Sequence, residues 1–234
     1  MKVAILYSGG KDSTYAIEYA LNRGWNIEYL LSVKPTRKDC YLFHYATVEH
    51  TKEQAQVLGL KHILVKCAVA DPKKEADIVK GVVERNMVDA VILGGVGLQI
   101  TQLKSVQDAL LPLGVEVFAA HAGLDHDKVM QEMLDKGYKF MITQVASDGL
   151  MNWLGRVVTS ENFEELKNAA FDYGFHIGFE GGYADTFMLD GPIFNKRIEV
   201  MASEKIVDDE YCGHIVFKRL KLADKAKKET FSLG

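Results

Sequence analysis

The sequence predicts an α/β fold in which a parallel-sheet core is followed by a smaller C-terminal α+β part. In the first half of the chain, short apolar runs alternate with stretches of helical spacing, the pattern of βαβ units with right-handed crossovers. In the second half this alternation ends, and short strands joined by tight turns follow. We therefore expect two domains, residues 1–122 and 123–234, packed closely because no linker composition separates them.

Five short apolar runs are expected to form the parallel sheet, because each is bounded by polar or glycine-containing turns. In chain order they are Val3–Tyr7, Ile27–Val33, His62–Cys67, Ala90–Leu93 and Val115–Ala119. The helices between them are predicted from apolar residues at helical spacing, with Gly24 ending the first and Asp71-Pro72 opening the second. Their expected ranges are Ser13 to Gly24, Asp71 to Asn86 and Thr101–Leu113.

The second half predicts two further helices and four strands. Asp125 is expected to cap a helix that ends near Lys136, and Ser160 is expected to cap a helix over Glu161–Tyr173. The expected strands are Lys139–Ala146, Arg197–Met201, Glu204–Val207 and His214–Leu220.

Composition places the chain among soluble globular proteins. Apolar residues make up 48% and charged residues 26% of the 234 residues, near the averages of about 45–50% and 25%. This excludes an intrinsically disordered chain, and no run approaches the ~18 apolar residues of a membrane span. The apolar stretch at the N-terminus is too short for the core of a signal peptide. These observations favour a cytoplasmic enzyme with no membrane partner.

Charge and cysteine spacing exclude further classes. The net charge is −4, whereas proteins that bind duplex nucleic acid are usually strongly basic, so we expect no stable nucleic-acid partner. The three cysteines, Cys40, Cys67 and Cys212, form no CxxC pair. Zinc ribbons and thioredoxin chemistry therefore lack their required spacing, and we interpret the cysteines as structural thiols.

One loop carries the predicted chemistry: Ser8–Ser13, with the sequence SGGKDS, between the first strand and the first helix. Its two glycines let backbone N–H groups approach an anion, the serine hydroxyls and Lys11 add donors, and the helix N-terminus adds a favourable dipole. The loop is neither a Walker A motif nor a dinucleotide fingerprint. It predicts a phosphate site, in which Asp12 is the natural carboxylate for Mg²⁺, with a helix-capping role as the alternative.

The same loop resembles the pyrophosphate-binding loop of the ATP pyrophosphatases, which split ATP between its α and β phosphates. This resemblance implies an adenine nucleotide α-hydrolase-like core. A longer resemblance, over about residues 3–200, is to the diphthine–ammonia ligase family. It rests on segments listed here in chain order: LYSGGKDSTYA, Phe43-His44, Ala146–Leu150, Trp153–Arg156, Glu180–Gly182 and Leu189–Pro192.

Membership of that family implies an ATP-dependent amidation. Diphthine on translation elongation factor 2 would be converted to diphthamide with ammonia, releasing AMP and pyrophosphate. Lys11 and Asp12 would be catalytic, and Asp12 would hold Mg²⁺. The implied ATP-binding residues are Ser8, Gly9, Gly10, Lys11, Asp12, Ser13, Gly94 and Gly95. The implied acceptor-binding residues are His44, Glu180, Gly181, Gly182, Tyr183, Thr186 and Asp190. The partners would be ammonia and the elongation factor 2 that carries diphthine. A homodimer is possible.

The acceptor half departs from the family pattern. Tyr183-Ala184 replaces a Glu-Tyr pair, Ser105 stands in place of an arginine, and Ala120-His121-Ala122 replaces Pro-Leu-Trp. We interpret His121 as an ordinary polar residue rather than a ligand or base. A paralogous AMP-forming enzyme that acts on another acceptor is therefore an alternative, and a tRNA-modifying enzyme and a non-catalytic nucleotide sensor are weaker ones.

Overall fold

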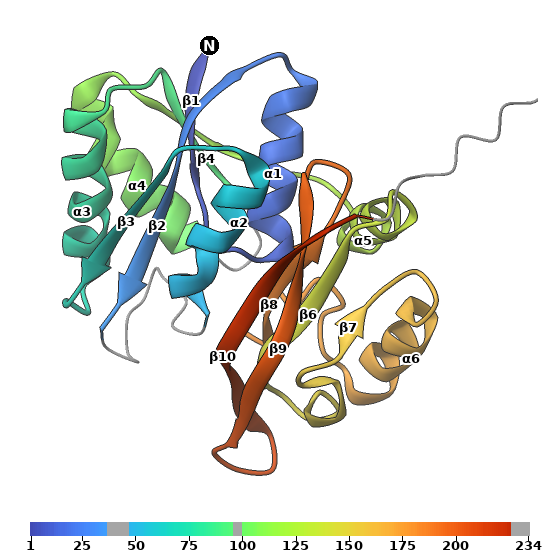
Figure 1. The fold of residues 1–234 in the computed structure, drawn as a ribbon. Coiled ribbons are helices and arrows are strands. Elements are labelled where there is room, and N and C mark those ends of the chain that lie inside the picture. The colour runs from blue at the N-terminus through green and yellow to red at the C-terminus, as the bar shows by residue number, and fades with distance from the viewer. Residues whose placement is uncertain (37–46, 96–99, 226–234) are drawn as a thin grey trace, which may run out of the picture.

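The computed structural model describes residues 1–36, 47–95 and 100–225, which form two sheets of five strands each (Figure 1). The first sheet has the strand order β3-β2-β1-β4-β5, and every neighbouring pair is parallel. Its strands are β1 (Lys2–Leu6), β2 (Asn26–Pro35), β3 (His62–Cys67), β4 (Ala90–Leu93) and β5 (Glu116–Ala119). The predicted parallel-sheet core is confirmed.

Helices cover both faces of this sheet, as side chains that alternate along β1 require. Val3 and Ile5 pack on one face with α1 (Lys11–Asn22) and α2 (Thr51–Leu58), which follows the short 3₁₀ helix η1 (Val48–His50). Ala4 and Leu6 pack on the other face with α3 (Pro72–Arg85) and α4 (Ile100–Leu110), which continues into η2 (Leu111–Leu113). Figure 1 shows the two pairs on opposite sides of the sheet. The predicted helices from Ser13, Asp71 and Thr101 are confirmed, with α1 beginning two residues earlier.

The second sheet is antiparallel and is built around β6 (Lys139–Ala146), which pairs with three other strands. These are β7 (Val157–Val158), β8 (Ala184–Asp190) and β10 (Cys212–Asp224), and β9 (Lys196–Val207) pairs with β10. The helices α5 (His126–Asp135) and α6 (Phe163–Tyr173) and the turn η3 (Met151–Trp153) accompany this sheet. Their apolar side chains share one core with β6 and β8, and Val57 of α2 also packs in that core. The two parts therefore pack directly against each other, and the division between residues 122 and 123 stays a prediction.

The structure corrects several expectations for the second half. Arg197–Met201 and Glu204–Val207 are one strand, β9, because the hairpin with β10 continues through them. Ser160 does not cap α6, since Asn162 occupies the N-cap position and no side chain makes a cap hydrogen bond there. The Asp125 side chain does accept hydrogen bonds from the first turn of α5, as predicted.

In the described part of the chain, no helix is both long and apolar enough to cross a membrane.

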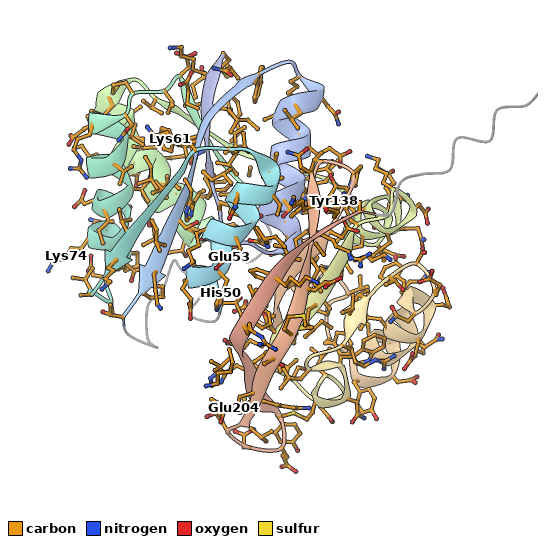
Figure 2. The ribbon with its side chains drawn as sticks, in the orientation of Figure 1. His50, Glu53, Lys61, Lys74, Tyr138 and Glu204 are labelled. Carbon is orange, nitrogen blue, oxygen red and sulfur yellow. The ribbon has the colours of Figure 1, made fainter. Side chains whose placement is uncertain are left out.

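Asp71 offers a test of the predicted helix start. Its side chain accepts a hydrogen bond from the backbone N–H of Lys74 at 2.9 Å. Figure 2 shows Lys74 at the outer edge of the molecule. We expect Asp71→Ala to lower the free energy of unfolding in urea by about 1 kcal/mol, because a first-turn N–H loses its acceptor. Asp77→Ala, on an exposed position of the same helix, is the control and should not destabilise. Equal stabilities of the two variants would contradict the capping role.

Candidate active site

The predicted phosphate loop runs from the end of β1 into α1 and is shaped by two glycines. Gly9 has φ +87°, in the left-handed region that favours glycine. A Cβ atom there would lie 2.4 Å from Oε1 of Gln54. The Gln54 amide donates hydrogen bonds at 2.8 Å to the carbonyl oxygens of Gly9 and Met188. The loop is therefore fixed between α2 and β8.

Gly10 occupies the N-cap position of α1 and lies against β8. A Cβ atom at Gly10 would be 3.0 Å from Oγ1 and 3.1 Å from the carbonyl oxygen of Thr186. Lys11 N–H donates to the same Oγ1 at 3.0 Å. Ser8 Oγ donates to Ser13 Oγ at 3.3 Å, and Ser13 Oγ donates to the Gly10 carbonyl oxygen. Since first-turn N–H groups have no acceptor within the helix, the loop has the donors and the dipole that suit an anion.

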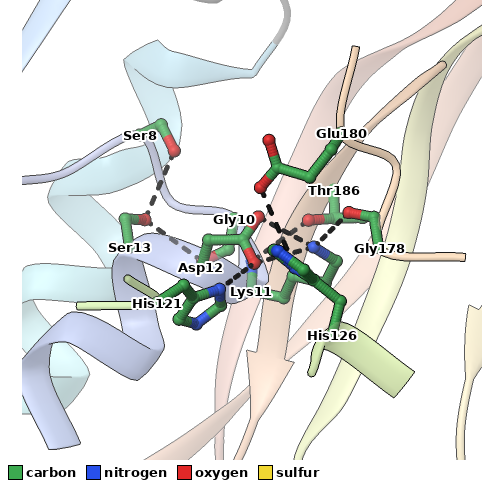
Figure 3. A network of polar contacts seen from close by, with 10 residues as sticks. All are labelled: Ser8, Gly10, Lys11, Asp12, Ser13, His121, His126, Gly178, Glu180 and Thr186. Carbon is green, nitrogen blue, oxygen red and sulfur yellow. Dashed lines mark hydrogen bonds and ion pairs between the residues drawn. The ribbon is translucent and has the colours of Figure 1, made fainter. Parts of the chain in front are cut away.

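The Lys11 side chain is buried, with 2% of its surface exposed. Its ammonium nitrogen donates to both carboxylate oxygens of Asp12, at 2.7 and 2.8 Å, and to the carbonyl oxygen of Gly178 at 2.7 Å (Figure 3). The ammonium thus connects the first turn of α1 to a segment that lies 167 residues further along the chain.

Asp12 is held in its ionised form. Burial by itself raises the pKa of this carboxyl, but the Lys11 ammonium and the His121 ring together outweigh burial and hold the pKa below its ordinary value. The Oδ1 atom of Asp12 lies 3.4 Å from Nδ1 of His121, and 30% of the side chain remains exposed. Asp12 therefore presents a carboxylate to the pocket at neutral pH.

His121 lies two residues after the end of β5 and is nearly fully buried beside Asp12. Burial lowers the pKa of its ring to about 4, although the Asp12 carboxylate acts in the opposite direction. The ring is thus neutral at pH 7 and makes an edge contact with Tyr15 at 4.5 Å between centroids. Among the described residues, neither ring nitrogen has a hydrogen-bond partner. The sequence could have indicated His121, because it follows a predicted parallel strand and the carboxyl ends of parallel strands share one edge of the sheet.

Two further histidines, which the sequence did not suggest, continue from His121 toward solvent. The ring of His126, the first residue of α5, lies 5.5 Å from that of His121 and 5.1 Å from that of the exposed His176. Burial lowers the pKa of both His126 and His176. Nδ1 of His126 lies 3.9 Å from Oε1 of Glu180. The buried Glu180 carboxylate is therefore faced by an imidazole that is neutral at pH 7.

The segment that carries Glu180, which we call the Gly178–Gly182 loop, has an unusual backbone. Gly181 and Gly182 have φ values of +103° and +83°, and Phe179 has a φ of +62° without being glycine. A left-handed backbone at a bulky residue costs on the order of 1–3 kcal/mol unless surrounding contacts hold it. Here Phe179 N–H donates to the His176 carbonyl oxygen at 2.8 Å, and the Phe179 side chain is buried.

The phosphate loop and the Gly178–Gly182 loop line one polar pocket between the two sheets. The residues that line it are Ser8, Gly10, Lys11, Asp12, Gly178, Phe179, Glu180, Gly182, Ala184, Asp185 and Thr186. Predicted ATP-binding and acceptor-binding residues thus meet in one place, because β8 packs against the phosphate loop. Gly178, Phe179 and Asp185 are members that sequence reasoning did not identify.

Other predicted site residues lie elsewhere. Tyr183 packs against the core of the second sheet. Asp190 lies at the far end of β8, where its Oδ1 is 2.9 Å from Nζ of Lys225. Gly95 is buried after β4 and does not line the pocket, and His44 lies outside the described residues. The assignment of these four residues to ligand binding stays a prediction.

Gly94, at the end of β4 (Ala90–Leu93), lies against the backbone of Asp12 and Ser13. A Cβ atom there would lie 2.4 Å from the carbonyl carbon of Asp12 and 2.5 Å from the backbone nitrogen of Ser13. The end of β4 and the first turn of α1 can be this close only because residue 94 has no side chain.

Within residues 1–36, 47–95 and 100–225, no three His, Cys, Asp or Glu side chains come together as ligands for an ion. Of the three cysteines, Cys67 is buried, Cys212 is partly buried and Cys40 lies outside the described part.

Comparison with known proteins identifies similar chains over nearly the whole length. A family model described as the diphthamide synthase N-terminal domain matches residues 1–110, and one described as its C-terminal domain matches residues 125–223. The chain is 27% identical to a diphthine–ammonia ligase from Homo sapiens, covering 96% of this chain and 94% of the relative. It is 28% identical to one from Danio rerio, covering 98% and 100%. A relative of the same name from Schizosaccharomyces pombe is 25% identical, and its matched region is 40% of its length.

Gly94→Ala tests the close contact between β4 and α1. We expect a loss of roughly 2 kcal/mol or more in the free energy of unfolding, because the added carbon meets backbone atoms that cannot rotate away. ATP affinity, measured by calorimetry, should fall with it, since the first turn of α1 must move. Gly81→Ala is the control, because its Cβ would meet nothing closer than 3.8 Å and alanine favours a helix interior. Wild-type stability of Gly94→Ala would show that the contact is not required.

Proposed function

Because the chain belongs to the diphthamide synthase family, we propose that it is an ATP-dependent ligase that amidates diphthine with ammonia. In the proposed reaction a carboxylate oxygen of diphthine attacks the α-phosphorus of ATP, and pyrophosphate leaves. Ammonia then attacks the acyl carbon of the adenylate, the amide forms and AMP leaves. The acceptor is diphthine on translation elongation factor 2, and the reaction takes place in the cytoplasm, where translation occurs.

One observation carries this proposal: the phosphate loop and the Glu180 segment line the same pocket. An enzyme that joins two substrates through an adenylate must hold the α-phosphorus next to the acceptor carboxylate, since most of its catalysis comes from positioning. A nucleotide sensor needs no acidic second loop at this place. The arrangement therefore supports a two-substrate reaction at the carboxyl edge of the parallel sheet.

The phosphate loop is proposed to bind the leaving phosphates through backbone N–H groups and through the hydroxyls of Ser8 and Ser13. Asp12 would hold Mg²⁺, which when bound neutralises charge that develops on the leaving pyrophosphate. The residues fit this ion, because Asp12 is ionised and partly exposed. Magnesium commonly uses one or two carboxylates together with phosphate oxygens, so a cluster of three protein ligands is not needed.

Glu180 is proposed to bind the cationic group of the acceptor, together with the backbone of Gly181 and Gly182 and with Thr186. Diphthine carries a trimethylammonium group, which a carboxylate attracts in a partly enclosed pocket. Lining the same pocket, Asp185 adds a second carboxylate. It supplies a negative charge in place of the glutamate of the family's Glu-Tyr pair, which Tyr183-Ala184 replaces in this chain.

The function is tested by following ATP consumption with purified elongation factor 2 in its diphthine form, with and without ammonium. We expect AMP and pyrophosphate in equal amounts, formed only when both acceptor and ammonium are present. Asp12→Asn should lower turnover by ~100-fold or more, equivalent to about 2.7 kcal/mol of transition-state stabilisation. Asp77→Asn, exposed on α3, is the matched control. Formation of ADP, or AMP formation that diphthine does not stimulate, would contradict the proposal, and the second result would favour the paralogue with another acceptor.

Glu180→Gln separates acceptor binding from ATP binding. We expect the KM for the acceptor to rise by about tenfold or more, because a charge-assisted contact of roughly 1.5–3 kcal/mol is lost. The dissociation constant for ATP should stay within about twofold, since the side chain keeps its shape and the phosphate loop is untouched. Glu164→Gln, exposed on α6, serves as the control. Loss of ATP binding by Glu180→Gln, or an unchanged acceptor KM, would overturn the assignment of Glu180.

A further inference from the structure

The ammonium of Lys11 has used all of its donors inside the protein. A lysine ammonium has three N–H bonds, and its nitrogen lies within 2.8 Å of three acceptors: both oxygens of Asp12 and the carbonyl oxygen of Gly178. With 2% of the side chain exposed, little of the group faces the pocket. The sequence suggested a phosphate-binding cation, whereas the structure gives this ammonium three acceptors within the protein.

We propose that Lys11 is a positioning residue that fastens the Gly178–Gly182 loop to the start of α1, rather than a ligand of the ATP phosphates. The consequence for catalysis rests on the proposed function, because only there does Glu180 on this loop bind the acceptor. The role of Lys11 in holding the Gly178–Gly182 loop does not depend on the proposed function. Figure 3 shows the Lys11 nitrogen between Asp12 and Gly178, with Glu180 on the same loop.

The Gly178–Gly182 loop requires such a contact. Its residues 179, 181 and 182 all have positive φ values, so the loop has no regular hydrogen-bond ladder to hold it. Gly178 lies between two groups: its carbonyl oxygen accepts from Lys11, and on its other side a Cβ atom would be 2.9 Å from the Cβ and Nδ1 atoms of His126. The Lys11 nitrogen also lies 5.7 Å from the centre of the Phe179 ring, a favourable cation–π distance.

Charge balance gives the same assignment. The ammonium of Lys11 contacts the carboxylate of Asp12 directly, so at the distance of a bound phosphate the two charges largely cancel. Attraction of phosphate would then come from N–H groups, hydroxyls and the helix dipole. Removal of both side-chain charges at once should therefore leave the attraction for phosphate nearly unchanged, whereas removal of the Asp12 charge alone should not weaken it.

The experiment compares Asp12→Asn with the double variant Lys11→Met/Asp12→Asn, which leaves no unpaired charge in the core. Amide hydrogen exchange of peptides spanning residues 176–184 is followed by mass spectrometry, and ATP affinity is measured by calorimetry without magnesium. We expect Asp12→Asn to keep loop protection within about twofold, and the double variant to exchange at least about tenfold faster. ATP affinity of the double variant should stay within about threefold of wild type. Lys73→Met, exposed on α3, is the control.

A third readout separates positioning from a general loss of structure. Between Asp12→Asn and the double variant, the KM for the acceptor should rise by at least about fivefold while the KM for ATP stays constant. Because loop exchange is read without turnover, failure of the amidation itself would leave the exchange result interpretable. Unchanged loop protection in the double variant, or a loss of ATP affinity of about tenfold or more, would overturn the proposal.

Wild-type protein gives an independent test if the double variant does not fold. Addition of saturating ATP without magnesium should leave the 176–184 peptides as protected as before, because Lys11 stays on Gly178. Faster exchange on ATP addition would mean that the ammonium leaves the loop for the phosphates, and would also overturn the proposal.

Discussion

A buried ammonium connects the two parts of the chain. Removing a charged group from water costs several kcal/mol, which is recovered only where acceptors with good geometry surround it. For Lys11 those acceptors come from two places, the Asp12 carboxylate at its own helix end and the Gly178 carbonyl of the second part. Satisfying one cation therefore fixes the direction of the Asp12 carboxylate and the position of the loop that carries Glu180.

Backbone contacts made possible by glycine complete the same arrangement. Gly94 brings β4 against the first turn of α1, Gly10 brings β8 against the phosphate loop, and Gly9 leaves room for Gln54. Gln54 in turn bonds to both the loop and β8. The pocket is thus held from three sides by main chain, which is stiffer than contacts between long side chains. Rigid support of this kind is what a reaction that depends on positioning requires.

Local patterns were sufficient to predict the first sheet, the helices α1, α3 and α4 and the loop between β1 and α1, because apolar periodicity, Asp71-Pro72 and the glycines act within a few residues, whereas α2 was not predicted. They were insufficient for β8 and for the role of Lys11. Residues 184–190 were not predicted as a strand, and β8 forms there because it pairs with β6. The acceptor that decides the role of Lys11 is a main-chain carbonyl, which carries no sequence signature. His121 and His126 likewise acquire meaning only when the ends of β5 and α5 are brought beside Asp12.

The charges around the pocket indicate how the proposed ligands stabilise one another. Among the described residues, Asp12, Glu180 and Asp185 line it together with Lys11, and burial lowers the pKa of the nearby histidines His121 and His126. Carboxylates in a pocket attract cations, such as a quaternary ammonium or Mg²⁺, and repel bare phosphates. Nucleotide bound with its metal and a cationic acceptor therefore each reduce the repulsion that the other experiences. In the proposed reaction, two substrates that must react with each other are in this way favoured together in one small site.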